Sequence, residues 1–222
     1  MKQNLWAAVL AVSGAVSAQA ALYPSGTLDA PIPEIGGSVD LYSTSINVSG
    51  SPTSITDVNV ILNISGGYNP DLYGYLVYNG TTVVLVNRIN VRTATPFGLS
   101  GAGMNVTLSD GATDIHNAGA GVLNSTYSPD GRAISPLSSG VTFDGASRQN
   151  SGNPLGLYDG MNPNGTWTLY FGDFSGGEVS MLNSWSLDIS AVPEPATVAL
   201  TIFAVLFGGV QFLRWRRGRA VR

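Results

Sequence analysis

Ser175 is the strongest candidate for a nucleophile in this sequence. It lies in the segment GDFSGG (172–177), where two glycines follow the serine. A serine nucleophile also needs a base at hydrogen-bonding distance, usually a histidine that a carboxylate orients. The only histidine, His116, lies in the glycine-rich segment DIHNAGAG, and no pattern in the sequence brings it near Ser175. We therefore interpret GDFSGG as a glycine turn that joins two strands.

Paired carboxylates are the other chemistry that would support a hydrolase. The two acids of a glycoside hydrolase come together only in the folded protein, so their spacing in the sequence does not exclude them. Four aspartates directly precede a glycine, a pattern typical of turns: Asp110, Asp130, Asp144 and Asp159. We expect a protein that is not an enzyme. A secreted hydrolase would need several aspartates to converge in one deep pocket.

Oxygen ligands for calcium are offered by the segment DGMNPNG, which contains Asp159, Asn162 and Asn164. Calcium takes about six to eight oxygens from carboxylates, amides and carbonyls, and no loop of the chain follows the EF-hand pattern. The chain has no cysteine, which excludes thiol catalysis and cysteine metal sites. We predict no cofactor, with a structural calcium ion at these three residues as the alternative to plain solvated turns.

The segments that would position these residues have the two-residue period of β-strands. Apolar and polar side chains alternate from Ile55 to Ile64, as a half-buried strand requires. Two β-rich runs flank Asn79-Gly80, a pair that readily takes the positive φ angles of a type I′ hairpin turn. Between 93 and 163 the chain is rich in Gly, Asn, Ser and Pro, and we expect long loops with short strands at Met104–Leu108 and Val141–Phe143.

Two further strands each contribute a tryptophan to the predicted core. The segment GTWTLYFGD directs Trp167, Leu169 and Phe171 to one face, and LNSWSLDIS does the same with Trp185, Leu187 and Ile189. No segment of the body shows apolar residues at sustained helical spacing. The sequence predicts an all-β domain over 21–191, an antiparallel two-sheet β-sandwich of the jelly-roll type.

The body of the chain resembles a known β-sandwich, the P domain (P/Homo B) of subtilisin-like proprotein convertases. The likeness covers about 55–190 and is carried by NPDLYGYLVYNGTTVVLVNR (69–88) and NGTWTLYFGDFSGGEVSMLNSWSLDI (164–189). In that family the P domain supports a neighbouring protease domain and is not itself the enzyme. No protease domain precedes the sandwich in this sequence, so the resemblance implies a fold and not an activity.

The two ends of the chain have the composition of targeting segments. Residues 1–20 combine a basic start, an apolar stretch and the small residues Ala18 and Ala20, which is the layout of a secretory signal peptide. Residues 196–213 contain no charge and would form a helix of about 27 Å, which is long enough to span a membrane marginally. The basic tail 214–222 would stay on the cytoplasmic side and act as a stop, with arginines at Arg214, Arg216, Arg217 and Arg219.

The charge distribution agrees with export of the middle of the chain. All fourteen acidic residues but only four of the ten basic ones lie between Asp29 and Glu194, which gives that part a net charge of −10. Such a surface repels phosphate backbones. We therefore expect no nucleic-acid partner.

The C-terminal segment 192–222 closely resembles the PEP-CTERM sorting signal of exopolysaccharide-producing Gram-negative bacteria. Its three parts follow in order: the motif Pro193, Glu194 and Pro195, then the apolar span 196–213, then the basic tail. Membership in that family implies that an exosortase, a membrane-embedded transpeptidase, recognises the motif and removes the tail. The resemblance implies export through the inner membrane, a membrane-anchored precursor, and release to the cell surface or extracellular matrix.

These features together favour a non-enzymatic surface or matrix protein associated with exopolysaccharide or biofilm. A carbohydrate-binding, lectin-like module is the alternative. It would depend on exposed tyrosines that stack on sugars, with Tyr68, Tyr73, Tyr75 and Tyr78 as candidates. Tyrosines on strands more often pack in a core or on a sheet face.

Overall fold

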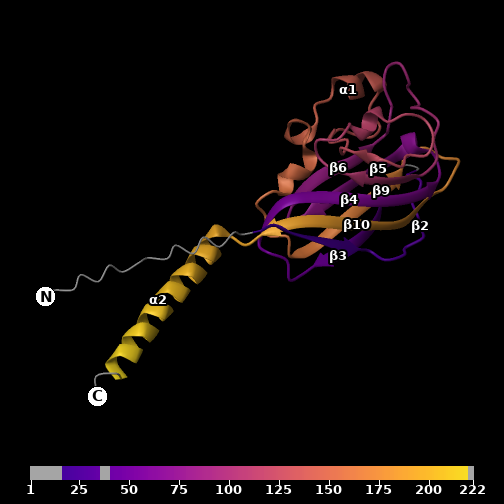
Figure 1. Ribbon diagram of the computed structural model, residues 1–222. Coiled ribbons are helices and arrows are strands. Elements are labelled where there is room, and N and C mark those ends of the chain that lie inside the picture. Colours follow the sequence, from indigo (N-terminus) through magenta and orange to yellow (C-terminus); the bar gives the residue numbers. More distant parts are fainter. Residues whose placement is uncertain (1–16, 36–40, 220–222) are drawn as a thin grey trace.

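Two β-sheets form the body of the protein in the computed structural model, which describes residues 17–35 and 41–219 (Figure 1). The first sheet has the strand order β1-β10-β4-β7-β8, with β2 also paired to β10, and the second has the order β3-β9-β5-β6. Neighbouring strands are antiparallel except β7 and β8. The predicted all-β sandwich is confirmed at this level. Most of the predicted signal peptide, 1–16, lies outside the described residues.

The strands have the following bounds. In the first sheet they are β1 (Gln19–Pro24), β2 (Ala30–Pro31), β4 (Ser54–Gly66), β7 (Met104–Leu108), β8 (Thr126–Tyr127) and β10 (Ser180–Val192). In the second sheet they are β3 (Tyr42–Val48), β5 (Leu72–Tyr78), β6 (Thr81–Asn87) and β9 (Gly165–Asp173). Short helical turns interrupt the connections: η1 (Asn69–Asp71), η2 (Ile115–Asn117), α1 (Gly140–Gly145), η3 (Gln149–Gly152) and η4 (Pro154–Tyr158).

The predicted hairpin is present as β5 and β6, which pair directly across a two-residue turn. Both turn residues have positive φ, 46° at Asn79 and 78° at Gly80, as a type I′ turn requires. Strand β4 includes the predicted strand from Ile55 to Ile64, and β7 has the predicted bounds. Local turn chemistry and alternation were sufficient for these elements.

The core lies between the two sheets. Trp167 of β9 and Trp185 of β10 come from different sheets and belong to one buried cluster, as predicted. The segment between β9 and β10 therefore crosses from one sheet to the other. Trp167 is fully buried, stacks on Tyr78 at a ring distance of 3.9 Å and meets Tyr158 edge-on at 4.9 Å. These aromatic contacts link β5, β9 and η4.

The predicted strand over Val141–Phe143 is wrong, because these residues lie in the short helix α1. Ser139 occupies the N-cap position with an extended backbone, and the Phe143 N–H donates to the Ser139 carbonyl. Phe143 is buried and stacks on the His116 ring at 5.2 Å. Alternation over three residues could not predict this contact with a distant loop, and β propensity depends strongly on such context.

The helix α2 (Pro195–Arg219) follows β10 and extends away from the sheets (Figure 1). It contains the predicted membrane span, 196–213, but the side chains at 196–198, 201 and 213 lie outside the described set. So do the side chains of the predicted stop residues Arg214, Arg216, Arg217 and Arg219. Within the part of the chain that the structure describes, no helix is long and apolar enough to cross a membrane.

Candidate functional site

The Pro-Glu-Pro motif lies at the junction between the body and α2. Strand β10 ends at Val192 and α2 begins at Pro195, so Pro193 and Glu194 are the only residues between them. Glu194 is exposed, and its backbone N–H donates to Thr53 Oγ1 at 3.3 Å. Prolines on both sides keep this segment extended and free of ladder hydrogen bonds. Glu194 is thus an accessible residue outside both sheets.

The start of the body lies beside its end. Strand β1 pairs with the last residues of β10 in antiparallel register, with Gln19 opposite Ala191 and Ala20 opposite Ser190. The predicted signal-peptide boundary after Ala20 and the motif that begins at Pro193 are therefore at the same end of the six-stranded sheet. Only Val192 separates Ala191, the last β10 residue that pairs with β1, from the motif.

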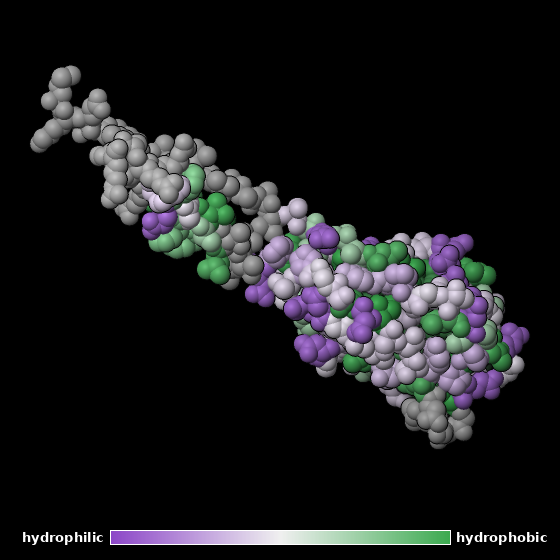
Figure 2. Space-filling model, turned by 90° about the horizontal axis from the view of Figure 1, so that it is seen from below, coloured by the Kyte–Doolittle hydropathy of each residue, from purple (hydrophilic) through white to green (hydrophobic). Residues whose placement is uncertain are grey.

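Most of the described side chains of α2 are apolar and exposed, as the green residues on the projecting helix in Figure 2 show, and Gln211 is an exposed polar residue among them. Phe203 is 66% exposed and Leu200 is 71% exposed. The other large apolar side chains that are exposed in the described part of α2 are Val205, Leu206, Phe207, Val210, Phe212 and Trp215. An exposed apolar surface of this kind normally marks a site of contact with a membrane or another protein.

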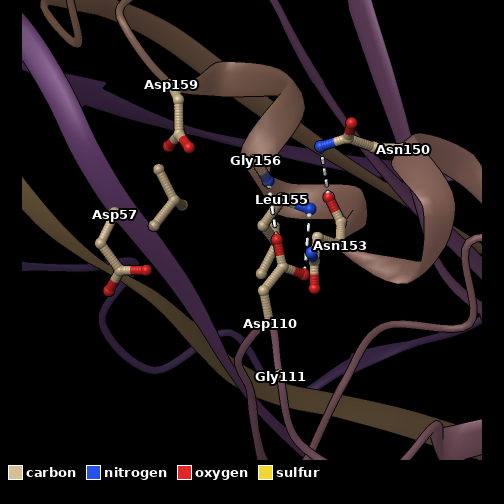
Figure 3. Close-up of a pocket in the computed structure, with 9 residues that line it drawn as sticks. Asp57, Asp110, Gly111, Asn150, Asn153, Leu155, Gly156 and Asp159 are labelled. Atoms are coloured by element: carbon tan, nitrogen blue, oxygen red, sulfur yellow. Dashed lines mark hydrogen bonds between the residues drawn. The ribbon is translucent and has the colours of Figure 1, made fainter.

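A pocket of about 360 Å³ lies beside β4 and contains three aspartates (Figure 3). Asp57 comes from β4, Asp110 follows β7, and Asp159 follows η4. The three side chains reach the pocket from different sides. Three aspartates thus converge in one pocket, which is one part of what a secreted hydrolase would need. The turn positions predicted for Asp110 and Asp159 gave no indication of it.

Hydrogen bonds and electrostatics show how these aspartates are used. The Asp110 carboxylate accepts bonds from the backbone N–H groups of Leu155, at 3.3 Å, and Gly156, at 2.7 Å, and so holds the start of η4. Burial raises the pKa of Asp110, although these two bonds act against it. The pKa of Asp159 is also raised, first by burial and then by the charges of Asp57 and Asp110. The pocket therefore concentrates negative charge and has one carboxylate committed to structure.

The three predicted calcium ligands do not face a common point. Asp159 lies in the pocket, whereas the amides of Asn162 and Asn164 bond to each other at 2.7 Å. Asn164 also exchanges two hydrogen bonds with the backbone of Ser51. These amides hold the loop before β9. Among the described residues, no group of three or more His, Cys, Asp or Glu side chains has the arrangement of a metal site.

Ser175 and His116 lie in different parts of the fold and have different hydrogen-bond partners. Ser175 is exposed, and its backbone N–H donates to Asp173 Oδ1 in the turn after β9. His116 is buried, and its ring contacts Asp130 Oδ2 at 2.8 Å and the Val91 carbonyl at 3.2 Å. The carboxylate beside His116 thus belongs to a buried cluster and not to a site that contains Ser175.

That buried cluster consists of His116, Asp130, Arg132, Asp114 and Arg148. Arg132 Nη1 lies 2.9 Å from Asp114 Oδ2 and 3.2 Å from Asp130 Oδ1. Arg148 Nε donates to the Asp130 carbonyl at 3.0 Å. Asp130 is fully buried. The cluster holds the loops that cover β6, where Asp130 and Gly131 bond to the strand backbone. Its members lie 2 to 34 residues apart in the sequence, without a motif.

Asp173 is a second buried acid with an unusual environment. Burial raises its pKa to about 6, and the charges of Asp71 and Glu34 add to this, while the bond from the Ser175 N–H acts in the opposite direction. An acid with a higher pKa in the folded protein than in the unfolded chain holds more protons when folded between those two pH values. The free energy of unfolding therefore falls as the pH rises from about 4 to about 6.

Replacement of Asp173 by asparagine is expected to remove this pH-dependent fall in the free energy of unfolding. Asparagine can still accept from the Ser175 N–H and stays neutral, so at pH 7 the variant should be more stable than the parent by about 2–3 kcal/mol at most. Urea unfolding at a series of pH values measures the difference, which should vanish below pH 4. Asp188→Asn, an acid on the outer side of β10, is the control. A constant difference at all pH values would refute this explanation.

The four candidate tyrosines do not form one surface. Tyr78 is buried against Trp167, and Tyr68 is half-buried before η1. Tyr73 and Tyr75 are half-buried on the outer face of β5, where they join Tyr170. Tyr75 stacks on Tyr170 at a ring distance of 4.9 Å, and Tyr73 lies 5.6 Å from Tyr75. Phe174 extends this group, 5.8 Å from Tyr73.

No family model matches this chain, and no curated protein matches it either. Two solved structures are similar to it at 15% sequence identity. The first is a crystal structure of the Aeromonas sobria serine protease (ASP) in complex with the chaperone ORF2; the match covers 80% of this chain and 28% of that chain, with a TM-score of 0.44. The second is a crystal structure of the A. sobria serine protease, with 79% and 27% coverage and a TM-score of 0.42. The present chain spans little more than a quarter of the chains it matches.

Proposed function

We propose that this chain is an exported, non-enzymatic surface or matrix protein that an exosortase processes at Pro193-Glu194-Pro195. The position of the motif carries the proposal, because Pro193 and Glu194 lie between the last strand of the body and α2, and Pro195 is the first residue of α2. A protease needs an extended, unpaired peptide of this kind. Cleavage there would remove the apolar α2 and leave every residue of β10 in its sheet.

The remaining features support the same function. In this proposal the exposed apolar side chains of α2 hold the precursor at the membrane beside the processing enzyme. The body then carries most of the negative charge of the chain into the cell envelope or extracellular matrix of a Gram-negative bacterium. We assign it a jelly-roll, P-domain-like architecture and an association with exopolysaccharide. The signal peptide over 1–20 would direct export.

A non-enzymatic body is favoured because the acids of the pocket have structural partners. Asp110 is bonded to two backbone N–H groups of η4, and Asp57 accepts a bond from the Asn59 amide at 2.9 Å. A glycosidase needs one acid that is free to donate a proton and a second that is free to act as base or nucleophile. Among the described residues, Asp159 is the one pocket acid whose carboxylate accepts no hydrogen bond, and one acid does not make such a pair. The pocket therefore does not change the proposal.

The proposal predicts that processing depends on the motif. Full-length chain would be produced with and without an exosortase, and the mass of the product would be measured by mass spectrometry. We expect loss of the segment after the motif only with the enzyme, and an intact tail in Glu194→Ala and in Pro195→Ala. Glu178→Ala, an exposed acid in the turn before β10, is the matched control and should be processed normally. If the mass of the product is the same with and without the exosortase, the proposed sorting function is wrong.

A further inference from the structure

The outer face of the four-stranded sheet carries an aromatic row: Tyr73, Tyr75, Tyr170 and Phe174. The outer faces of solvated sheets are normally polar, so four adjacent half-buried rings need an explanation. Neighbouring rings are 4.9 to 5.8 Å apart. The row crosses from β5 to β9 and continues into the turn after β9. The pairing of Tyr75 with Tyr170 in the sheet register sets its position.

A hydroxyl band lies next to the aromatic row on the same face. It is formed by the outward side chains of β3 and the first half of β9, namely Ser43, Ser45, Asn47, Thr166 and Thr168. The Ser45 and Thr168 hydroxyls bond to each other at 3.0 Å, and Thr166 Oγ1 donates to Asn47 Oδ1 at 2.8 Å. The band therefore offers donors and acceptors that a bound molecule can share.

The outward strand residues of this face carry no formal charge, although the body as a whole is strongly acidic. None of the outward residues of β3, β5 and β9 in the described chain is Asp, Glu, Lys or Arg. Burial raises the pKa of Tyr75, and it does the same for Tyr73, so both phenols stay protonated and neutral at physiological pH. An ionic partner would gain nothing here, and an anionic one would be repelled by the rest of the body.

The size of the face argues against a protein partner. Four half-buried aromatic side chains expose on the order of 300 Å², whereas a stable protein interface buries about 800 Å² on each partner. The β6 side of the sheet is closed, because the Gly131 N–H bonds to the Val84 carbonyl and Gln149 Oε1 accepts from the Val84 N–H. The open area suits a few sugar rings, which have apolar C–H faces and hydroxyl rims.

We propose that the aromatic row and the hydroxyl band together bind an uncharged polysaccharide, with sugar C–H groups against the rings and sugar hydroxyls on the band. This inference rests on the proposed function, because it identifies the surface by which a matrix protein would bind polysaccharide. The proposed site differs from the set of sugar-stacking tyrosines predicted from the sequence. It keeps Tyr73 and Tyr75, excludes Tyr78 because that side chain is buried, and adds Tyr170 and Phe174. Tyr68 is not part of the row.

Affinity electrophoresis of the full-length chain in detergent tests the proposal. Hydroxyethylcellulose, glucomannan and dextran are the neutral probes, and alginate is the anionic probe. We expect retardation by at least one neutral polysaccharide and none by alginate. Tyr170→Ala and Tyr75→Ala should each weaken binding about tenfold, the usual effect of removing a central aromatic contact. Phe97→Ala, an aromatic that is 79% exposed on a different loop, should bind as the parent does.

Two further measurements keep the outcome clear. Tyr170→Phe keeps the ring and should retain most of the affinity, and thermal unfolding of each variant shows that the sandwich is intact. Retardation by alginate alone, or by no neutral probe, would overturn the proposal. So would retardation of both alanine variants as strong as that of the parent. So would self-association of the parent that Tyr170→Ala abolishes, because the face would then bind a second copy. Tail processing is measured separately by mass, so loss of sorting with retained binding, or the reverse, identifies which proposal has failed.

Discussion

Replacement of Asp130 by alanine is expected to destabilise the protein by about 3–5 kcal/mol, the usual cost of removing one partner from a buried ion pair. Asp130 is fully buried and accepts bonds from the His116 ring at 2.8 Å, from Arg132 Nη1 at 3.2 Å and from the Arg132 N–H at 3.1 Å. Alanine would leave the Arg132 N–H without its acceptor, while His116 Nδ1 would keep the Asn87 carbonyl at 3.2 Å and Arg132 Nη1 would keep Asp114 Oδ2 at 2.9 Å. Such a loss is a large part of the 5–15 kcal/mol that typically stabilises a domain.

Urea unfolding monitored by tryptophan fluorescence would measure this effect. Asp130→Asn keeps one acceptor oxygen and removes the charge, so it should lie between the parent and Asp130→Ala. Asp144→Ala is the matched control, since this acid is exposed and accepts hydrogen bonds from Thr93, and it should change the free energy of unfolding little. If Asp130→Ala unfolds at the same urea concentration as the control, the cluster does not stabilise the loops.

The elements that depend on the chemistry of adjacent residues could be predicted from the sequence. The alternation of β4 and the Asn79-Gly80 turn predicted a strand and a hairpin, because period and positive φ are properties of adjacent residues. The burial of Trp167 and Trp185 in one core also followed from alternation. Strand order did not, because the sheet that a strand joins depends on pairings between residues more than a hundred positions apart, such as Ser45 with Thr168.

The candidate sites divide in the same way. The Pro-Glu-Pro motif is contiguous, and its position at a junction follows from the strand before it and the apolar run after it. The pocket aspartates, the His116 cluster and the aromatic row are assembled from distant segments. Turn chemistry gave a correct account of Asp110 as a residue of a loop, but it could not show that Asp57 and Asp159 face the same pocket. The alternation in GTWTLYFGD predicts that Tyr170 lies on the outer face of its strand. It does not predict that Tyr170 pairs with Tyr75.

Trp167→Ala is the second variant with a large expected effect, a loss of about 3–5 kcal/mol in the free energy of unfolding. The indole fills the space between Tyr78 and Tyr158 and donates from Nε1 to the Pro163 carbonyl at 2.9 Å. Alanine would leave a cavity where three aromatic rings now pack. Because the contacts join β5, β9 and η4, the cavity would loosen both the second sheet and the loop beside it.

Phenylalanine variants at the two core tryptophans separate packing from hydrogen bonding. Trp185 is equally buried, but its Nε1 has no hydrogen-bond partner among the described residues. Trp167→Phe loses a hydrogen bond and leaves the Pro163 carbonyl without that donor, whereas Trp185→Phe removes an unsatisfied donor. We therefore expect Trp167→Phe to cost about 1–2 kcal/mol more than Trp185→Phe in urea unfolding. Equal losses would mean that Trp185 Nε1 finds a partner in solution, because the two side chains lose the same volume and differ in the described structure mainly in that bond.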